Sequence, residues 1–380
     1  MKIGILTYHR SVNYGAFLQA YALQKYVQHV MGETATVELV DYNSQKAHEL
    51  YISQFKKLEK ADGKKLYQYI QFQRCVNLLP KSKDKLVSDD LSQIQSFLQK
   101  QKYDVIIAGS DEIWKVNGMR GFPNAYWMNF DLGYTIKASY AASSRNDMNM
   151  LQEKQIEYMQ TALKQFSYIG VRDRITQRLV QDLDVPIQPA LNCDPTFLYS
   201  FGFDKEEYGE KVRKKLHIPN DKKIMGIMIK DDALCSQMKR KYEKTHVVVS
   251  LLDELPSADY NLLGITPFEW LKTIGIMDML VTNRFHGTVF AIKNHVPFLS
   301  VDDYDGVENS KIYDLLSRCG LEEHYFPYQN AKTPQKRAEV LNKMDAILQM
   351  HGKIDFAGAI SRERLRAENF KEFLQGLGGR

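Results

Sequence analysis

The chain has 380 residues, which exceeds the usual limit of about 250 to 300 residues for one hydrophobic core, so we expect two domains. Hydrophobic residues make up 44% and charged residues 26% of the sequence, values typical of soluble globular proteins that argue against low-complexity and membrane-spanning classes. A net charge of +5 favours an anionic ligand or a membrane surface, and nothing indicates nucleic-acid binding.

Two features predict where the protein works. The apolar run within residues 1–8 is too short for a signal peptide and is typical of a first strand. The cysteines, Cys75, Cys193, Cys235 and Cys319, lack metal-type spacing, so a reducing compartment is the simplest interpretation. We therefore expect a cytoplasmic protein without a metal or a cofactor; contact with the inner face of the membrane and a homo-oligomer stay open.

Strand-like runs alternate with helical ones along most of the chain, which predicts an α/β fold with two parallel sheets. The first set of strands is expected at 2–7, 36–41, 103–108, 136–141 and 168–171, and the second at 224–229, 246–252, 262–265, 279–282 and 296–301. The helices are expected at 15–30, 151–166, 175–183, 206–216, 233–243, 267–276, 285–294, 335–350 and 356–374.

The domain boundary is expected between the two sets of strands. We predict an N-terminal Rossmann-like domain at 1–203, a C-terminal one at 204–352, and a C-terminal helix and tail at 353–380. The insertion 45–101 has no clear strand, so it is either a helical cover or a mobile lid. The glycine-rich end of the tail is expected to be disordered.

The first expected strand is followed by Asn13, Tyr14 and Gly15 at the start of a helix. Ligands of open α/β sheets bind at the carboxyl ends of the strands, so these residues are candidates for binding a substrate. A Gly-x-Gly-x-x-Gly fingerprint is absent, which disfavours a dinucleotide site. Asn13 and Gly15 could equally serve only to cap the helix.

A second candidate elbow follows the strand at 103–108. Ser110 and Asp111 could hold sugar hydroxyls or accept protons, and Trp114 could stack on a sugar. Trp114 could equally belong to the core.

Three more residues are placed at strand ends. Arg172 could bind an anion or form a surface pair with Asp173. Asp194 could face a cleft or cap a turn, and Lys230 could reach a cleft or only face solvent.

The most informative elbow follows the strand at 279–282. Arg284 offers a planar fork for carboxylate or phosphate, His286 can move a proton near neutral pH, and Gly287 would let a ligand approach the backbone. The helix that begins there adds N–H groups suited to an anion. The alternative is that Arg284 pairs with Asp278 or Asp302 and that His286 only caps the helix.

Six segments in this order resemble the polysaccharide pyruvyl transferases, and Arg-Phe-His-Gly is the most diagnostic of their motifs. The matching segments are 13–23, 108–114, 139–143, 170–173, 194–197 and 283–288. The resemblance implies two Rossmann-like domains that face each other across a cleft, as in the GT-B fold. It also implies transfer of pyruvate from phosphoenolpyruvate to a sugar as a ketal, with the Arg and His of the motif on the donor.

The residues suit this chemistry, because phosphoenolpyruvate carries two anionic groups and its enol carbon must gain a proton. We expect His286 to act as general acid, Arg284 to assist it, and Asp111 to act as base. The expected donor-binding residues are Arg172, Arg284, Phe285, His286, Gly287 and Lys230. The expected acceptor-binding residues are Asn13, Tyr14, Gly15, Ser110, Asp111, Trp114, Tyr140 and Asp194.

Two other functions compete with this one. A nucleotide-sugar glycosyltransferase of the same architecture would need a nucleotide site. A relative without catalytic activity could bind a sugar or carrier, although the intact motif argues against it. Phe285 stands where many relatives carry Leu, a conservative change. The sequence leaves open whether the acceptor is a free, nucleotide-linked or lipid-linked sugar of a bacterial surface polysaccharide.

Overall fold

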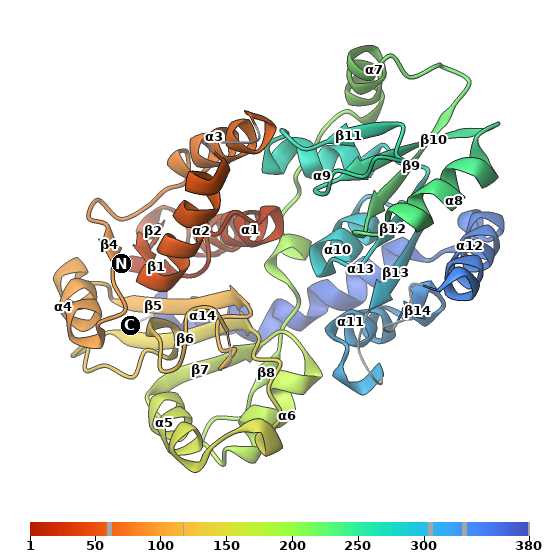
Figure 1. Ribbon diagram of the computed structural model, residues 1–380. Helices are drawn as coiled ribbons and strands as arrows, with labels where there is room; N and C mark the ends of the chain where they lie inside the picture. The colour runs from red at the N-terminus through yellow and green to blue at the C-terminus, as the bar shows by residue number, and fades with distance from the viewer. Residues whose placement is uncertain (59–62, 117, 303–306, 329–332, 379–380) are drawn as a thin grey trace. The chain divides into compact units, whose positions relative to one another are not determined.

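The computed structural model divides the chain into two compact units (Figure 1). It describes residues 1–58, 63–116, 118–302, 307–328 and 333–378. Unit 1 comprises Met1–Leu66, Phe72–Ser200 and Glu363–Arg380, and unit 2 comprises Tyr67–Gln71 and Phe201–Arg362.

Unit 1 is built on a six-stranded sheet in which every pairing is parallel, with the order β2-β1-β5-β6-β7-β8. The strands are β1 (Lys2–Leu6), β2 (Thr36–Leu39), β5 (Val105–Asp111), β6 (Ile136–Ala142), β7 (Phe166–Val171) and β8 (Ala190–Leu191). The central strand β5 is almost wholly buried, as expected for a parallel strand that is covered on both faces. Because every pairing is parallel, the carboxyl ends of all the strands lie at one edge of the sheet.

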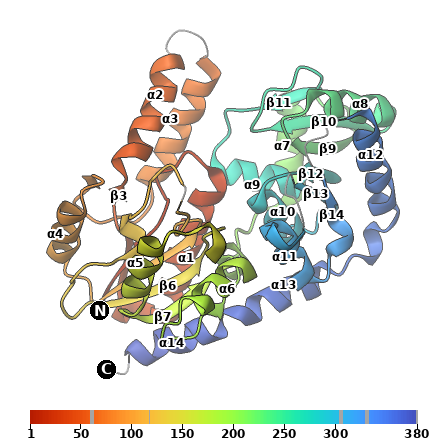
Figure 2. The ribbon, with the colours of Figure 1, turned by 60° about the horizontal axis from the view of Figure 1, so that its bottom comes forward.

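Helices cover both faces of this sheet. Apolar residues of α4 and α5 enter the core on one face, while α1 packs on β5 and α14 packs on β7 and α1. Figure 2 shows α14 alongside β7 and α2 beside α3. The helices are α1 (Tyr14–Met31), α2 (Gln45–Leu58), α3 (Gly63–Asn77), α4 (Leu91–Gln101), α5 (Glu153–Leu163), α6 (Arg174–Asp182) and α14 (Glu368–Gly378). A short parallel pair, β3 (Tyr42–Asn43) and β4 (Leu86–Val87), flanks α2 and α3 in the chain.

Unit 2 repeats the same plan, with a parallel sheet of order β11-β10-β9-β12-β13-β14. Its strands are β9 (Lys223–Met228), β10 (His246–Leu251), β11 (Tyr260–Leu262), β12 (Met279–Thr282), β13 (Phe298–Asp302) and β14 (Tyr325–Pro327). Its helices are α7 (Lys205–Leu216), α8 (Asp232–Tyr242), α9 (Pro267–Gly275), α10 (Phe285–Lys293), α11 (Lys311–Cys319), α12 (Pro334–Gln349) and α13 (Phe356–Arg364), whose end belongs to unit 1.

The sequence predicted the two parallel sheets, and the structure confirms the α/β class. Four short strands were missed, namely β3, β4, β8 and β14, because two or three residues carry too little periodicity to detect. The expected strand at 262–265 overlaps the observed strand only at Leu262, since β11 spans Tyr260–Leu262.

The C-terminal segment is the largest departure from the expected domains. We expected 353–380 to be a separate helix and tail, but the structure assigns Glu363–Arg380 to unit 1 and the preceding residues to unit 2. The expectation that the glycine-rich end is disordered is wrong for Gly376–Gly378, which lie in α14; residues 379–380 lie outside the described part. The insertion 45–101 contains three helices, α2, α3 and α4, and also the strand β4.

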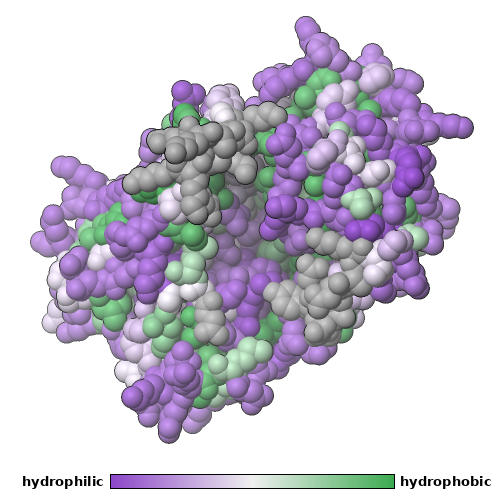
Figure 3. Space-filling view, in the orientation of Figure 1, coloured by the Kyte–Doolittle hydropathy of each residue, from purple (hydrophilic) through white to green (hydrophobic). Residues whose placement is uncertain are grey.

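The surface in Figure 3 is largely hydrophilic, with hydrophobic residues scattered singly or in small groups. Among the described residues, no helix is both long and apolar enough to span a bilayer. In the same part of the chain, no group of three or more His, Cys, Asp and Glu side chains could hold a metal ion.

Candidate functional site

The candidate residues lie at the carboxyl edges of the two sheets. Unit 2 carries the expected donor residues except Arg172, and unit 1 carries Arg172 and the expected acceptor residues.

The elbow between β12 and α10 forms where the sequence predicted it. Arg284 is the N-cap of α10, with extended backbone angles of −103° and 126°. Its backbone N–H donates to Thr282 Oγ1 at 3.0 Å, which fixes the turn out of the strand. The N-cap residue is therefore Arg284 and not His286, and the Arg284 side chain makes no capping hydrogen bond to the N–H groups of the first turn of α10. These N–H groups face the edge of the sheet without an intrahelical acceptor.

The Arg284 side chain is 52% exposed, and its Nη2 lies 3.8 Å from Asp253 Oδ2. The alternative partners named from the sequence are wrong. Asp278 accepts a hydrogen bond from the Ile224 N–H at 2.8 Å, and Asp302 accepts one from Ser310 Oγ at 2.7 Å. At 3.8 Å the contact with Asp253 is long for a charge-assisted hydrogen bond, so the guanidinium can still bind an anion from solvent.

His286 lies in the first turn of α10 and is 8% exposed. Its ring meets the edge of the Phe285 ring, with the two centroids 5.4 Å apart and the planes perpendicular. Lys311 Nζ stands 5.4 Å from the centroid of Phe285. Phe285 therefore packs on the imidazole and limits the orientations that it can adopt.

Gly287 has a packing role that the sequence did not predict. A Cβ at this position would lie 2.5 Å from Thr282 Oγ1 and 2.7 Å from Met228 Cε. The close neighbours are thus side chains of β12 and β9, and the glycine permits the helix to pack against the strand ends. The expectation that Gly287 also gives a ligand access to the backbone stays a prediction.

Gly287→Ala should destabilise the protein by about 1–3 kcal/mol, because the added methyl group overpacks the contact between α10 and the sheet. Urea unfolding followed by circular dichroism would measure the loss. Gly376→Ala is the control, since a Cβ there meets nothing within 4 Å in a helix, so it should leave stability equal or slightly higher. Equal stability of wild type and Gly287→Ala would contradict the packing role.

In unit 1, Arg172 forms the centre of a buried ion cluster. Its side chain is 1% exposed, its Nη1 lies 3.3 Å from Asp194 Oδ2, and its Nη2 lies 3.7 Å from Asp111 Oδ1. Burial acts to lower the pKa of Arg172, but the carboxylates of Asp111 and Asp194 raise it above its ordinary value. Because the guanidinium is enclosed and compensated by two carboxylates, it offers no free face to phosphoenolpyruvate in this structure.

The carboxylates near Arg172 have different roles. Asp194 caps the 3₁₀ helix Pro195–Leu198 by accepting from the Thr196 N–H at 3.0 Å, as its turn-cap interpretation predicted. The surface pair of Arg172 with Asp173 is wrong, because Asp173 is buried and caps α6 through the Thr176 N–H at 2.8 Å. Asp111 keeps 14% of its side chain exposed, so it is the member of the cluster that a substrate can reach.

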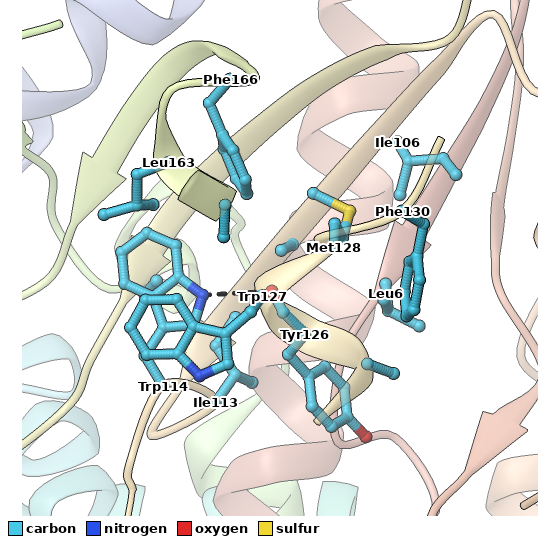
Figure 4. Close-up of a cluster of buried hydrophobic side chains, with 14 of the residues drawn as sticks. Leu6, Ile106, Ile113, Trp114, Tyr126, Trp127, Met128, Phe130, Leu163 and Phe166 are labelled. Carbon is cyan, nitrogen blue, oxygen red and sulfur yellow. Dashed lines mark hydrogen bonds between the residues drawn. The ribbon is translucent and has the colours of Figure 1, made fainter. Parts of the chain in front are cut away.

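Trp114 and Tyr140, two of the expected acceptor residues, are fully buried. Trp114 has no exposed surface; it stacks on Trp127 with centroids 5.0 Å apart and donates to the Tyr126 carbonyl at 3.1 Å (Figure 4). The prediction that Trp114 belongs to the core is therefore correct, and the prediction that it stacks on a sugar is wrong. Tyr140 is also enclosed, against Phe370 of α14.

Ser110 is likewise enclosed. Its N–H donates to Gln19 Oε1 at 3.1 Å and its carbonyl accepts from Thr7, so it fixes β5 to α1 rather than facing a ligand. Asn13 caps α1 by accepting from the Ala16 N–H at 3.2 Å, as its alternative interpretation predicted, while Tyr14 and Gly15 are buried in the first turn. In unit 2, Lys230 is exposed just after β9.

The sequence reasoning missed a polar group just after β1. Arg10 Nη2 donates to Asp41 Oδ2 at 2.6 Å, and His9 Nε2 lies 3.4 Å from Asp41 Oδ1. Burial raises the pKa of Asp41, but hydrogen bonds from His9 and Arg10 outweigh it and hold the pKa well below its ordinary value. The rule that strand ends carry function could have found His9 and Arg10. Arg120, which reaches the same loop, gave no signal.

The comparisons with known proteins now decide the family. The model of the polysaccharide pyruvyl transferase family matches residues 13–305. The chain belongs to the polysaccharide pyruvyl transferase family. The match covers both sheets' candidate elbows, including Asp111 and the Arg284–Gly287 motif. No curated protein matches the chain significantly.

Solved structures show the same fold at low sequence identity. The UDP-GlcNAc 2-epimerase from Neisseria meningitidis, bound to UDP-GlcNAc, aligns with a TM-score of 0.56 and 10% identity over 99% of this chain and 100% of its own. The enzyme from Methanocaldococcus jannaschii aligns with 0.53 and 11% over 96% and 98%. The one from Rickettsia bellii aligns with 0.52 and 8% over 98% and 95%. This pyruvyl transferase family member thus has a GT-B-type fold.

Proposed function

We propose that the protein transfers pyruvate from phosphoenolpyruvate to a sugar of a bacterial surface polysaccharide or its precursor, with the donor bound at the elbow between β12 and α10. The half-exposed guanidinium of Arg284 at the start of a helix is the observation that carries this proposal. Membership of the family supports transfer of a pyruvyl group.

The charges of the elbow match the charges of the donor. Phosphoenolpyruvate has a carboxylate and a phosphate, and Arg284 can bind either one through two parallel hydrogen bonds. The N-terminus of α10 adds partial positive charge at the same point. Lys230 follows β9, which pairs with β12 in the register Met228 to Thr282, so it lies at the same edge and can supply a second cation.

The reaction requires two proton movements. C3 of phosphoenolpyruvate gains a proton, which makes C2 electrophilic; two sugar hydroxyls then form bonds to C2, and the C2–O bond to phosphate breaks. Of the two hydroxyl protons, one returns to the acid that protonated C3, and the other is carried away by the released phosphate. His286, beside Arg284, is the residue that can deliver a proton to the donor.

The acceptor is assigned to unit 1, where Asp111 is the candidate base. Arg172 contacts its carboxylate at 3.7 Å and is itself held by Asp194, so Arg172 is a positioning residue here. This contact orients the Asp111 carboxylate, which is the partly exposed member of the cluster, and we no longer assign Arg172 to the donor.

Arg284→Gln should raise the KM for phosphoenolpyruvate about tenfold or more, because a charge-assisted hydrogen bond to the donor is lost. Phosphate release with phosphoenolpyruvate and a panel of free, nucleotide-linked and lipid-linked sugars measures it, and product mass identifies the ketal. Arg240→Gln, an exposed change of equal charge on α8, should leave KM unaltered. Turnover of a nucleotide sugar without phosphoenolpyruvate would instead favour a glycosyltransferase and refute the proposal.

A further inference from the structure

Arg120 is a buried cation of unit 1 that has no carboxylate partner. The residue is 9% exposed, and it forms no ion pair with an Asp or Glu of the described residues. Its Nη2 donates to Ser11 Oγ at 2.6 Å, and its guanidinium carbon stands 3.5 Å from the centroid of the Tyr8 ring. Its Nε is enclosed and has no hydrogen-bond partner in the described part of the chain. Burying a charge without a carboxylate partner costs desolvation free energy that nothing fully repays.

The aromatic neighbours of Arg120 cannot act as counter-ions. Burial raises the pKa of Tyr8 well above its ordinary value, and burial raises the pKa of Tyr126 to about 12 although Arg120 lowers it. Both phenols therefore stay neutral near neutral pH. Asp111 is the carboxylate that influences Arg120, but it lies against Arg172.

Two further sources of positive charge adjoin Arg120. Ser11 belongs to the loop that leads into α1, since its carbonyl accepts from the Asn13 N–H at 2.6 Å. The N-terminus of this 18-residue helix carries partial positive charge. Lys46 Nζ is also near, because a Cβ at Gly121 would lie 3.0 Å from it. An anion at this place would meet a guanidinium, an ammonium and a helix N-terminus.

We infer that Arg120, Lys46 and the start of α1 form a phosphate subsite that binds the diphosphate of a nucleotide-linked or lipid-linked acceptor sugar. The inference deepens the proposed function and rests on its assignment of the acceptor to unit 1. A neutral sugar would leave Arg120 uncompensated, whereas a phosphate supplies the missing charge and acceptors for its N–H groups. The other source of the same chemistry is the phosphate of the donor, which the test separates.

Isothermal titration calorimetry should be done with inorganic pyrophosphate and, separately, with phosphoenolpyruvate. Arg120→Gln should weaken pyrophosphate binding about tenfold or more and leave phosphoenolpyruvate binding unchanged, because it removes a charged donor from the acceptor subsite alone. Arg284→Gln should show the reverse pattern. Arg120→Lys keeps the charge, so it should lose less affinity for pyrophosphate than Arg120→Gln does. This difference would show that the loss in Arg120→Gln reflects the missing charge and not a folding defect. Arg178→Gln, exposed on α6 of the same unit, should match wild type in both titrations.

Three results would overturn the inference: no binding of pyrophosphate to wild type, unchanged pyrophosphate affinity in Arg120→Gln, or loss of phosphoenolpyruvate binding in that variant with pyrophosphate retained. The last result would assign Arg120 to the donor. Failure of wild type to bind phosphoenolpyruvate would count against the proposed function alone, because the pyrophosphate titration does not depend on it.

Discussion

His286→Ala should lower kcat at least about a hundredfold with phosphoenolpyruvate and the acceptor, because the donor would lose the group that delivers a proton to it. The ring of Phe285 packs against the imidazole in the first turn of α10, which restricts the orientations that His286 can adopt. KM for phosphoenolpyruvate should change much less than kcat, because Arg284 and the helix N-terminus remain. Initial rates of phosphate release would separate the two constants.

His286→Asn and His29→Ala provide the comparison for this experiment. Asn keeps a hydrogen-bonding side chain but cannot move a proton, so it should be as slow as Ala if proton transfer is the role of His286. His29 is exposed in α1 of unit 1, and its replacement should leave the rate unaltered. A His286→Asn variant with the wild-type rate would show that the imidazole only binds, and the assigned acid would have to be sought elsewhere.

Asp194→Ala should destabilise unit 1 by about 3–5 kcal/mol, which is the usual cost of removing one partner of a buried ion pair. Both Asp194 and Arg172 have almost no exposed surface, so the guanidinium would stay buried with Asp111, 3.7 Å away, as its remaining carboxylate. The variant would also lose the cap of the 3₁₀ helix at Thr196. Urea unfolding, followed by the fluorescence of Trp114 and Trp127, would measure the loss.

The fluorescence assay needs a background in which it reports on one unit. Trp270 belongs to unit 2 and is the third tryptophan of the chain, so a Trp270→Phe background restricts the signal to unit 1. Asp194→Asn keeps the hydrogen-bond geometry and removes the charge, so its difference from Asp194→Ala isolates the two contributions. Asp84→Ala removes an exposed partner of Lys100 and should cause no measurable change. An Asp194→Ala variant as stable as wild type would disprove the role of the ion cluster.

Most of the fold could be predicted from the sequence. Runs such as residues 105–108 of β5 are apolar throughout, and helices with a periodic apolar face separate them, so the parallel α/β class and the elbow at Arg284 could be predicted directly. Asp194 as a turn cap and Asn13 as a helix cap were also among the alternatives considered, because capping depends only on residues two or three positions along the chain.

The sequence could not reveal which polar residues meet at a sheet edge. Asp111 ends β5 and Arg172 follows β7, and Ser11 and Arg120 are separated by 109 positions, so only the tertiary packing brings each pair together. For the same reason, a tryptophan beside a strand end cannot be assigned to a ligand or to the core from its position alone. Trp114 proved to be core because Trp127, from the 3₁₀ helix Ala125–Trp127, stacks on it.

The sequence by itself determined the family motif, the two parallel sheets and the placement of Arg284 and His286 at a helix start, because each depends on short-range order along the chain. Only the tertiary structure decided which charges are compensated: Arg172 by Asp194 and Asp111, and Arg284, among the residues that the structure describes, by Asp253 at 3.8 Å. Charge compensation depends on distances of a few ångströms between residues remote in sequence, and folding alone sets those distances.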